Sequence, residues 1–261
     1  MMCDNRPIGI FDSGVGGLSV LKELRQVLPN EKFLYFGDTL RVPYGDKSID
    51  ELVICTRRIL DFFKTQNVKA VIVACNTCSA NTIDIVKNDY DFEILGLIEP
   101  TAEYVKNLDI KKIGLIATIA TVNSSSYNKA IEPFGIKVFA QGCPKLVKLV
   151  ERGQVNSPEV KEILADYLKP LLNEKIEKLI LGCTHYPFLV PAMKEMGFKD
   201  DFFVNPAICL AQKTKEFLEK NRLSNKDRAQ VFEFFVSAKP DEFKNNAKLF
   251  FGNIQNVTLV E

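Results

Sequence analysis

Two stretches of this chain share one pattern: Val71-Ile72-Val73-Ala74-Cys75-Asn76-Thr77 and Leu179-Ile180-Leu181-Gly182-Cys183-Thr184-His185. In each, an apolar run typical of a buried strand ends in a thiol followed by hydroxyl and amide or imidazole groups. Polar groups at this position indicate a ligand site beyond the carboxyl ends of parallel strands. Because the pattern occurs twice, it predicts a site with one thiol on each side.

Strands and helices alternate through the rest of the sequence. Apolar residues recur at helical spacing from Leu18 to Leu28, and Ser48 to Glu51 has the spacing of a capping box that opens another helix. A further helix is expected over 240–250. Strands are predicted at 7–11, 32–36, 68–74, 92–98, 113–118, 230–236 and 254–260. This order predicts an α/β fold whose parallel sheets are covered on both faces.

The pattern restarts halfway along the chain. Residues 113–118 resemble residues 8–13 at an offset of 105, and the second thiol motif lies 108 residues after the first. We therefore expect two similar parallel-sheet domains, with the active site in the cleft between them. The first would contain residues 1–98 and 206–261 with Cys75, and the second residues 99–205 with Cys183. The alternative is that parallel α/β units resemble one another without duplication.

Composition excludes several classes of protein. The 261 residues are 46% hydrophobic and 26% charged, as in a globular protein. With 34 basic and 33 acidic residues, the chain has no bulk attraction for nucleic acid or an anionic membrane. It shows no secretory signal and no apolar stretch approaching the ~18 residues of a membrane span. Its seven cysteines, an odd number, indicate reduced thiols in the cytoplasm.

The individual motifs leave alternatives open. The loop from Asp12 to Gly17 could hold an anion at a helix N-terminus, or form a tight turn in which Asp12 or Ser13 caps the helix. The loop containing Pro43, Tyr44 and Gly45 is better explained by a turn with a packed tyrosine.

The thiols are equally ambiguous. Cys75 and Cys78 could form a redox pair, or Cys75 alone could be functional with Cys78 buried in a helix. A zinc site could use both together with Cys183 and His185. Cys183 and His185 could be a nucleophile and its base, or a capped loop. From the residues alone, Glu151 is a solvent-facing helix residue.

Taken together, these motifs closely resemble the glutamate racemases of the aspartate/glutamate racemase superfamily. The resemblance rests on pieces found in order along the chain: residues 12–18, 37–39 with 41–45, 75–77, 117–118 with 121–122, 149–151 and 182–187. It implies two α/β domains, a homodimer, and interconversion of L- and D-glutamate without a cofactor or metal, supplying D-glutamate for peptidoglycan.

The resemblance also implies roles for individual residues. Cys75 would take the Cα proton of D-glutamate and Cys183 that of L-glutamate. Asp12 would support the first thiol, and His185 with Glu151 the second. The substrate would be held by Asp12, Ser13, Pro43, Tyr44, Gly45, Asn76, Thr77, Thr118, Thr121, Thr184 and His185.

This chain departs from the family pattern at a few positions. Asn205 stands before Pro206 where an acid is more usual, Lys145 and Lys148 replace apolar or proline residues, and Ala117 replaces a glycine. Three other classes of function remain as alternatives: a zinc-binding domain, a cysteine-nucleophile hydrolase or amidotransferase, and a non-enzymatic ligand-binding protein. Aspartate and hydantoins are alternative substrates, because the motifs do not encode side-chain length.

Overall fold

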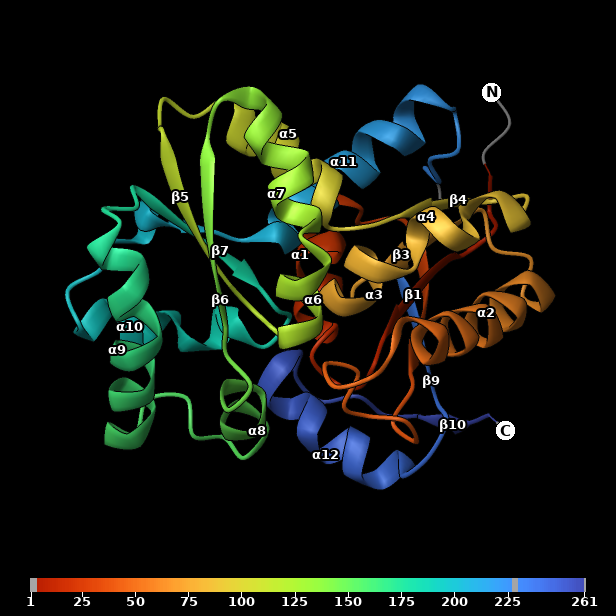
Figure 1. Ribbon diagram of the computed structural model, residues 1–261. Coiled ribbons are helices and arrows are strands. Elements are labelled where there is room, and N and C mark those ends of the chain that lie inside the picture. The colour runs from red at the N-terminus through yellow and green to blue at the C-terminus, as the bar shows by residue number, and fades with distance from the viewer. Residues whose placement is uncertain (1–3, 227–229, 261) are drawn as a thin grey trace.

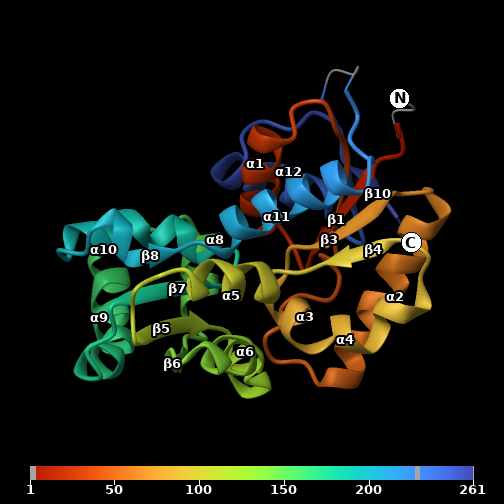
Figure 2. The ribbon, with the colours of Figure 1, turned by 90° about the horizontal axis from the view of Figure 1, so that it is seen from above.

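The chain folds around two separate parallel sheets. The computed structural model describes residues 4–226 and 230–260. Sheet A contains six strands in the order β10-β9-β2-β1-β3-β4, and sheet B contains four in the order β6-β5-β7-β8. Figure 2 separates the two sets, with the strands and helices of sheet B on one side and those of sheet A on the other.

The strands of sheet A come from both ends of the described chain. They are β1 (Ile8–Asp12), β2 (Lys32–Gly37), β3 (Ala70–Val73), β4 (Glu93–Leu95), β9 (Val231–Val236) and β10 (Thr258–Leu259). Sheet B is formed by β5 (Lys112–Ala117), β6 (Lys137–Gly142), β7 (Lys178–Gly182) and β8 (Phe203–Val204). Every neighbouring pair is parallel.

Helices cover both sheets, as Figure 1 shows. They are α1 (Leu18–Val27), α2 (Ile49–Thr65), α3 (Asn76–Asn81), α4 (Ile83–Val86), α5 (Ile98–Lys106), α6 (Ile119–Ser124), α7 (Ser126–Ile131), α8 (Leu146–Glu151), α9 (Pro158–Asn173), α10 (Val190–Glu195), α11 (Pro206–Lys220) and α12 (Pro240–Phe250). Short 3₁₀ turns occupy η1 (Lys87–Asp89), η2 (Glu132–Phe134), η3 (Tyr186–Leu189) and η4 (Asp200–Phe202).

The two sheets repeat one strand order. In sheet A, β2-β1-β3-β4 are neighbours, and in sheet B β6-β5-β7-β8 are neighbours in the corresponding order. The strand that precedes Cys75 and the strand that precedes Cys183 therefore occupy equivalent positions. The predicted fold class, two similar parallel-sheet α/β units, is confirmed.

Alternate side chains of each central strand face opposite layers of helices. In β1, Ile8 and Ile10 join an apolar cluster with α1, α11 and α12, whereas Phe11 joins a second cluster with α2. Because both faces are covered, β1 and β3 are buried along their whole length. The first cluster continues into sheet B through Leu179 and Leu181, so the two halves share a core.

Most predicted elements are found, some with different ends. The helix after Ser48 begins with the expected capping box, in which Ser48 Oγ accepts from the Glu51 amide and Glu51 accepts from the Ser48 amide. The strands expected over 92–98 and 254–260 are shorter, because α5 already begins at Ile98 and only Thr258–Leu259 pair with β9.

Two residues that depart from the family pattern, Asn205 and Ala117, lie at the boundaries of regular elements. Asn205 caps α11, where its Oδ1 accepts from the Ala207 amide at 3.1 Å. Ala117 is buried at the end of β5.

Cys3 and the outermost ends of the proposed first domain, residues 1–3 and 261, lie outside the described residues, as do 227–229. In the described ranges no helix is both long and apolar enough to cross a membrane.

Candidate active site

A cavity of about 220 Å³ lies beyond the carboxyl ends of β1 and β3 in sheet A and of β5 and β7 in sheet B. It is lined by both thiols of the repeated motif and by loop residues from each half. The lining residues are Asp12, Ser13, Val42, Pro43, Tyr44, Gly45, Asp46, Cys75, Asn76, Thr77, Thr118, Ile119, Cys143, Pro144, Val147, Lys148, Glu151, Cys183, Thr184 and His185. A site at the carboxyl ends of parallel strands is the position that the sequence predicted.

Cys75 lies at the N-cap of α3 and is 5% exposed. The Cys78 thiol, one helical turn further on, and the backbone amides of Thr77 and Cys78 lower the pKa of Cys75. Burial and the charge of Asp12 act in the opposite direction. Cys75 is therefore a thiol whose environment favours the thiolate.

Cys183 follows β7 and is the first of three side chains connected in series by hydrogen bonds. Its Sγ lies 3.6 Å from Nδ1 of His185, and Nε2 of His185 lies 3.2 Å from Oε1 of Glu151. Burial alone would lower the pKa of His185, but hydrogen bonds to Cys183 and Glu151 outweigh it and raise the pKa to about 10. His185 is thus an imidazolium at neutral pH, and its positive charge lies beside the Cys183 sulfur. Glu151 is exposed at the end of α8, as expected for a solvent-facing helix residue, and its carboxylate also lines the cavity beside His185.

Asp12 ends β1 beneath the cavity and is 1% exposed. Its Oδ2 accepts from the Gly14 amide at 3.1 Å, whereas Oδ1 has no hydrogen-bond partner in the part of the chain that the structure describes. Burial raises the pKa of Asp12, and the positive charge of His185 opposes that effect. A buried carboxyl oxygen without a partner is available to accept a hydrogen bond from a bound cation such as an ammonium group.

The glycines after Asp12 allow close packing, Gly16 against the other half of the molecule and Gly17 against Asp12 of its own half. A Cβ on Gly16 would lie 2.4 Å from both His185 Cε1 and Thr184 Oγ1, and one on Gly17 would lie 2.5 Å from Asp12 Cβ. Gly17 itself is the N-cap of α1, so the expectation that Asp12 or Ser13 caps this helix is wrong. Ser13 instead lines the cavity.

Hydroxyl and amide groups from both halves meet on one wall of the cavity. Thr77 Oγ1 lies 3.0 Å from Thr118 Oγ1, which lies 2.9 Å from Thr121 Oγ1. Thr121 is 1% exposed and does not line the cavity, so it lies behind Thr118. Asn76 and Thr184 complete the polar lining.

The loop with Pro43, Tyr44 and Gly45 closes another side, and its Val42–Pro43 peptide bond is cis. The Tyr44 hydroxyl donates to Asp38 Oδ2 at 2.5 Å, so it belongs to a buried hydrogen-bond network. Asp38 also accepts from Arg41 and Ser237. Asp38 fixes this loop although it does not line the site.

Sequence reasoning missed several lining residues. Cys143, Ile119, Val147 and Lys148 come from the loop after β6 and from α6 and α8. The strand before Cys143, β6, was not among the predicted strands, so no local signal assigned Cys143 to the carboxyl edge of the sheet. Lys148, noted as a departure from the family pattern, is exposed and adds a positive charge to the lining of the cavity.

The geometry bears on the zinc interpretation. Within the described ranges, no three His, Cys, Asp or Glu side chains are grouped closely enough to hold a metal ion. Cys78 is fully buried in α3, where the Thr56 hydroxyl donates to its Sγ at 3.7 Å. The proposed set of Cys75, Cys78, Cys183 and His185 is therefore not assembled. The six described cysteines are all free thiols.

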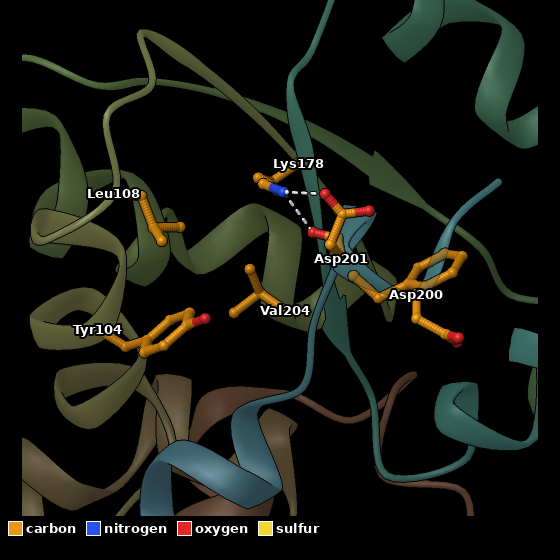
Figure 3. A pocket seen from close by; sticks show the side chains of 7 residues that line it. Tyr104, Leu108, Lys178, Asp200, Asp201 and Val204 are labelled. Carbon is orange, nitrogen blue, oxygen red and sulfur yellow. Dashed lines mark hydrogen bonds and ion pairs between the residues drawn. The ribbon is translucent and has the colours of Figure 1, made fainter.

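A second hollow lies at the far edge of sheet B, between α5 and β8 (Figure 3). Its charged side chains are already paired: Lys178 with Asp201, and Asp200 with Lys194. It offers neither a thiol nor a histidine, so it lacks the reactive groups that line the first cavity.

The two similar parallel-sheet α/β units and the paired thiols place this protein among the α/β racemases. The chain belongs to the Asp/Glu/hydantoin racemase family, whose profile matches residues 8–213. It is 45% identical over 266 residues to "Glutamate racemase 2" of Caldanaerobacter subterraneus subsp. tengcongensis, an alignment that covers 99% of this chain and 98% of that protein.

Solved structures agree with this assignment. Glutamate racemase isoform RacE1 from Bacillus anthracis superposes with a TM-score of 0.94 at 32% identity, covering 99% of this chain and 98% of that one. The glutamate racemase of Francisella tularensis, solved in complex with D-glutamate, gives a TM-score of 0.91 at 34% identity, with the same coverage. The family resemblance inferred from the sequence is confirmed.

Proposed function

We propose that this protein interconverts L- and D-glutamate without a cofactor, by proton transfer between two thiols, and so supplies D-glutamate for peptidoglycan synthesis. The observation that carries the proposal is that Cys75 and Cys183, from equivalent strands of the two sheets, line one cavity. The full-length similarity to glutamate racemases supports glutamate as the substrate.

Two thiols suit racemisation, because the reaction removes a proton from one face of Cα and returns a proton to the other. In the D-to-L direction, the Cys75 thiolate takes the Cα proton, and the Cys183 thiol gives its own proton to the opposite face. The L-to-D direction starts from the reverse protonation states. A free cysteine has a pKa of about 8.5, and the lowered pKa of Cys75 brings its thiolate within reach near neutral pH.

The Cα proton is very weakly acidic beside a carboxylate, so the site has to stabilise the negative charge that develops. Hydrogen bonds from Asn76, Thr77 and Thr184 to the substrate carboxylate would strengthen as this charge forms. The unpaired oxygen of Asp12 would hold the substrate ammonium group. His185, held by Glu151, would stabilise the thiolate of Cys183.

The experiment that tests the proposal is a polarimetric or circular dichroism assay on purified protein with L-glutamate and, separately, L-aspartate. We expect the signal of L-glutamate to decay to zero, and that of L-aspartate to persist. Decay of the aspartate signal alone would show the wrong amino acid, and a stable signal for both would contradict a racemase of either.

We also infer that the two sheets mark two domains that divide near residues 98 and 206. The support is that sheet A uses strands within 8–95 and 231–259, whereas sheet B uses strands within 112–204. The homodimer and the cytoplasmic location implied by the resemblance are likewise proposals. Light scattering on the purified protein tests the first, and fractionation of the source cells tests the second.

A further inference from the structure

Tyr127 is a buried tyrosine that reaches the candidate site from the other half of the molecule. It lies on α7, which follows β5 of sheet B, and it is 1% exposed. Its hydroxyl donates to Oδ1 of Asn76 at 2.7 Å. Asn76 is the first residue of α3, directly after Cys75, and lines the cavity while only 4% exposed.

This hydrogen bond decides which end of the Asn76 amide faces the cavity. A side-chain amide has an acceptor oxygen on one side and an NH₂ donor on the other, and its orientation follows from its hydrogen-bond partners. Burial raises the pKa of Tyr127, so the phenol stays protonated and remains a donor. A donor on one side holds the amide oxygen, which leaves the NH₂ group for the cavity.

We propose that Tyr127 is a positioning residue, whose hydroxyl holds the Asn76 amide with its NH₂ group toward the substrate carboxylate. The inference rests on the proposed racemase function and adds a residue to it. Without the hydroxyl, the amide can turn and present its oxygen to the carboxylate. Two hydrogen-bond acceptors, the amide oxygen and a carboxylate oxygen, would then face each other as soon as the substrate binds, which weakens binding.

The surroundings allow this hydroxyl to be removed without moving the ring. Helix α3 lies against α6, as Figures 1 and 2 show, and other bonds hold α3 to the segment containing Tyr127. Asn81 donates to the carbonyl of Ala120, and Ser126 donates to the carbonyl of Ala80. Tyr127→Phe therefore deletes one donor while the packing between the helices remains.

The test compares Tyr127→Phe in two backgrounds. In the otherwise natural protein, we expect kcat/KM for glutamate to fall about tenfold, the usual effect of losing one hydrogen bond, mostly through a higher KM. In the Asn76→Ala background, the same substitution should change kcat/KM less than twofold, because the amide is no longer present to be positioned. Equal losses in both backgrounds, or no loss in the first, would overturn the proposal.

A matched control separates positioning from general destabilisation. Thr214 is also fully buried, and its hydroxyl donates to the carbonyl of Leu210 within α11, away from the cavity. Thr214→Val should lower the melting temperature as Tyr127→Phe does and leave KM unchanged. A KM increase in both variants would assign the effect to stability and reject positioning.

Calorimetric titration with D-glutamate keeps this proposal distinct from the proposed function. Tyr127→Phe should bind D-glutamate about tenfold more weakly than the natural protein. A natural protein that binds D-glutamate but does not racemise it would contradict the proposed reaction, and the two binding constants would still decide the role of Tyr127. A natural protein that neither binds nor racemises glutamate would overturn both.

Discussion

At the scale of single residues, the two thiols have different surroundings. Cys75 is flanked by a second thiol and by backbone amides, whereas Cys183 is flanked by an imidazolium and, behind it, a carboxylate. L- and D-glutamate have equal free energies in water, so kcat/KM must be the same in both directions for every variant. The pH dependence of kcat/KM therefore reports the two thiols and His185 together, and variants that alter one of these groups separate its contribution.

The first prediction concerns Glu151. Its carboxylate helps to raise the pKa of His185 to about 10, so Glu151→Gln should lower that pKa. The imidazolium is the form below the pKa, and the substitution should move the alkaline decline of kcat/KM to lower pH. A rate profile from pH 6 to 11 measures this. Glu162→Gln, an exposed change on α9, should keep the natural profile, and an unshifted profile for Glu151→Gln would contradict the assigned role.

The second prediction concerns Cys78, which family resemblance did not assign. The Cys78 thiol is the largest influence that lowers the pKa of Cys75. Cys78→Ala should raise that pKa and move the acid decline of kcat/KM to higher pH, because the thiolate forms later. Cys78→Ser keeps a donor and should stay close to the natural profile. Identical profiles for Cys78→Ala and the natural protein would exclude the hydrogen bond.

At the scale of helices and strands, local signals located most elements and only part of the site. Residues that directly follow predicted strands, such as Asp12, Cys75 and Cys183, could be assigned to the site because parallel strands end at one edge. Asp38 and Tyr127 could not, because Asp38 acts through the Tyr44 hydroxyl and Tyr127 reaches Asn76 from a helix of the other half. Their roles depend on how separate elements pack, which no local pattern contains.

The capping box of α2 gives a prediction at this scale. Ser48→Ala removes the acceptor for the Glu51 amide, so we expect the free energy of unfolding to fall by about 1 kcal/mol. Urea denaturation measures the loss. Ser48→Thr preserves the cap and should lose only a few tenths of that. A loss for Ser48→Ala no greater than for Ser48→Thr would mean that tertiary packing alone sets the start of α2.

At the scale of the whole molecule, two copies of one strand order place their thiols on a common cavity. The sequence offsets of 105 and 108 residues predicted this repeat, and the strand orders of the two sheets agree with it. Sequence did not predict how closely the halves approach. That depends on contacts such as Gly16 against His185 and Thr184, where a side chain on the glycine would not fit.

A buried ion pair joins distant parts of the chain at the opposite end of sheet A. Lys69 Nζ lies 2.6 Å from Glu31 Oε2, and both side chains are almost completely buried. Lys69 also donates to the carbonyls of Asp4 and Leu223, and Glu31 accepts from the Asn225 amide. The pair thus connects the start of the described chain, the beginnings of β2 and β3, and the segment after α11.

We predict that Lys69→Met destabilises the protein by about 3–5 kcal/mol, because it leaves Glu31 buried without a cation. Urea denaturation followed by far-ultraviolet circular dichroism measures the change. The double variant Lys69→Met with Glu31→Gln removes the unpaired charge and should recover part of the loss. A single variant that costs less than about 1 kcal/mol would show that Glu31 is relieved by water or by protonation.

The claim on which the whole account depends is that a thiol on each side of Cα exchanges protons with glutamate. Nuclear magnetic resonance of L-glutamate racemised in D₂O tests it most directly. We predict that, early in the reaction, the D-glutamate product carries deuterium at Cα while the remaining L-glutamate keeps its proton, and that Cys75→Ala and Cys183→Ala, each folded, do not racemise. Deuterium appearing equally in both enantiomers, or full turnover by either alanine variant, would contradict the two-thiol account.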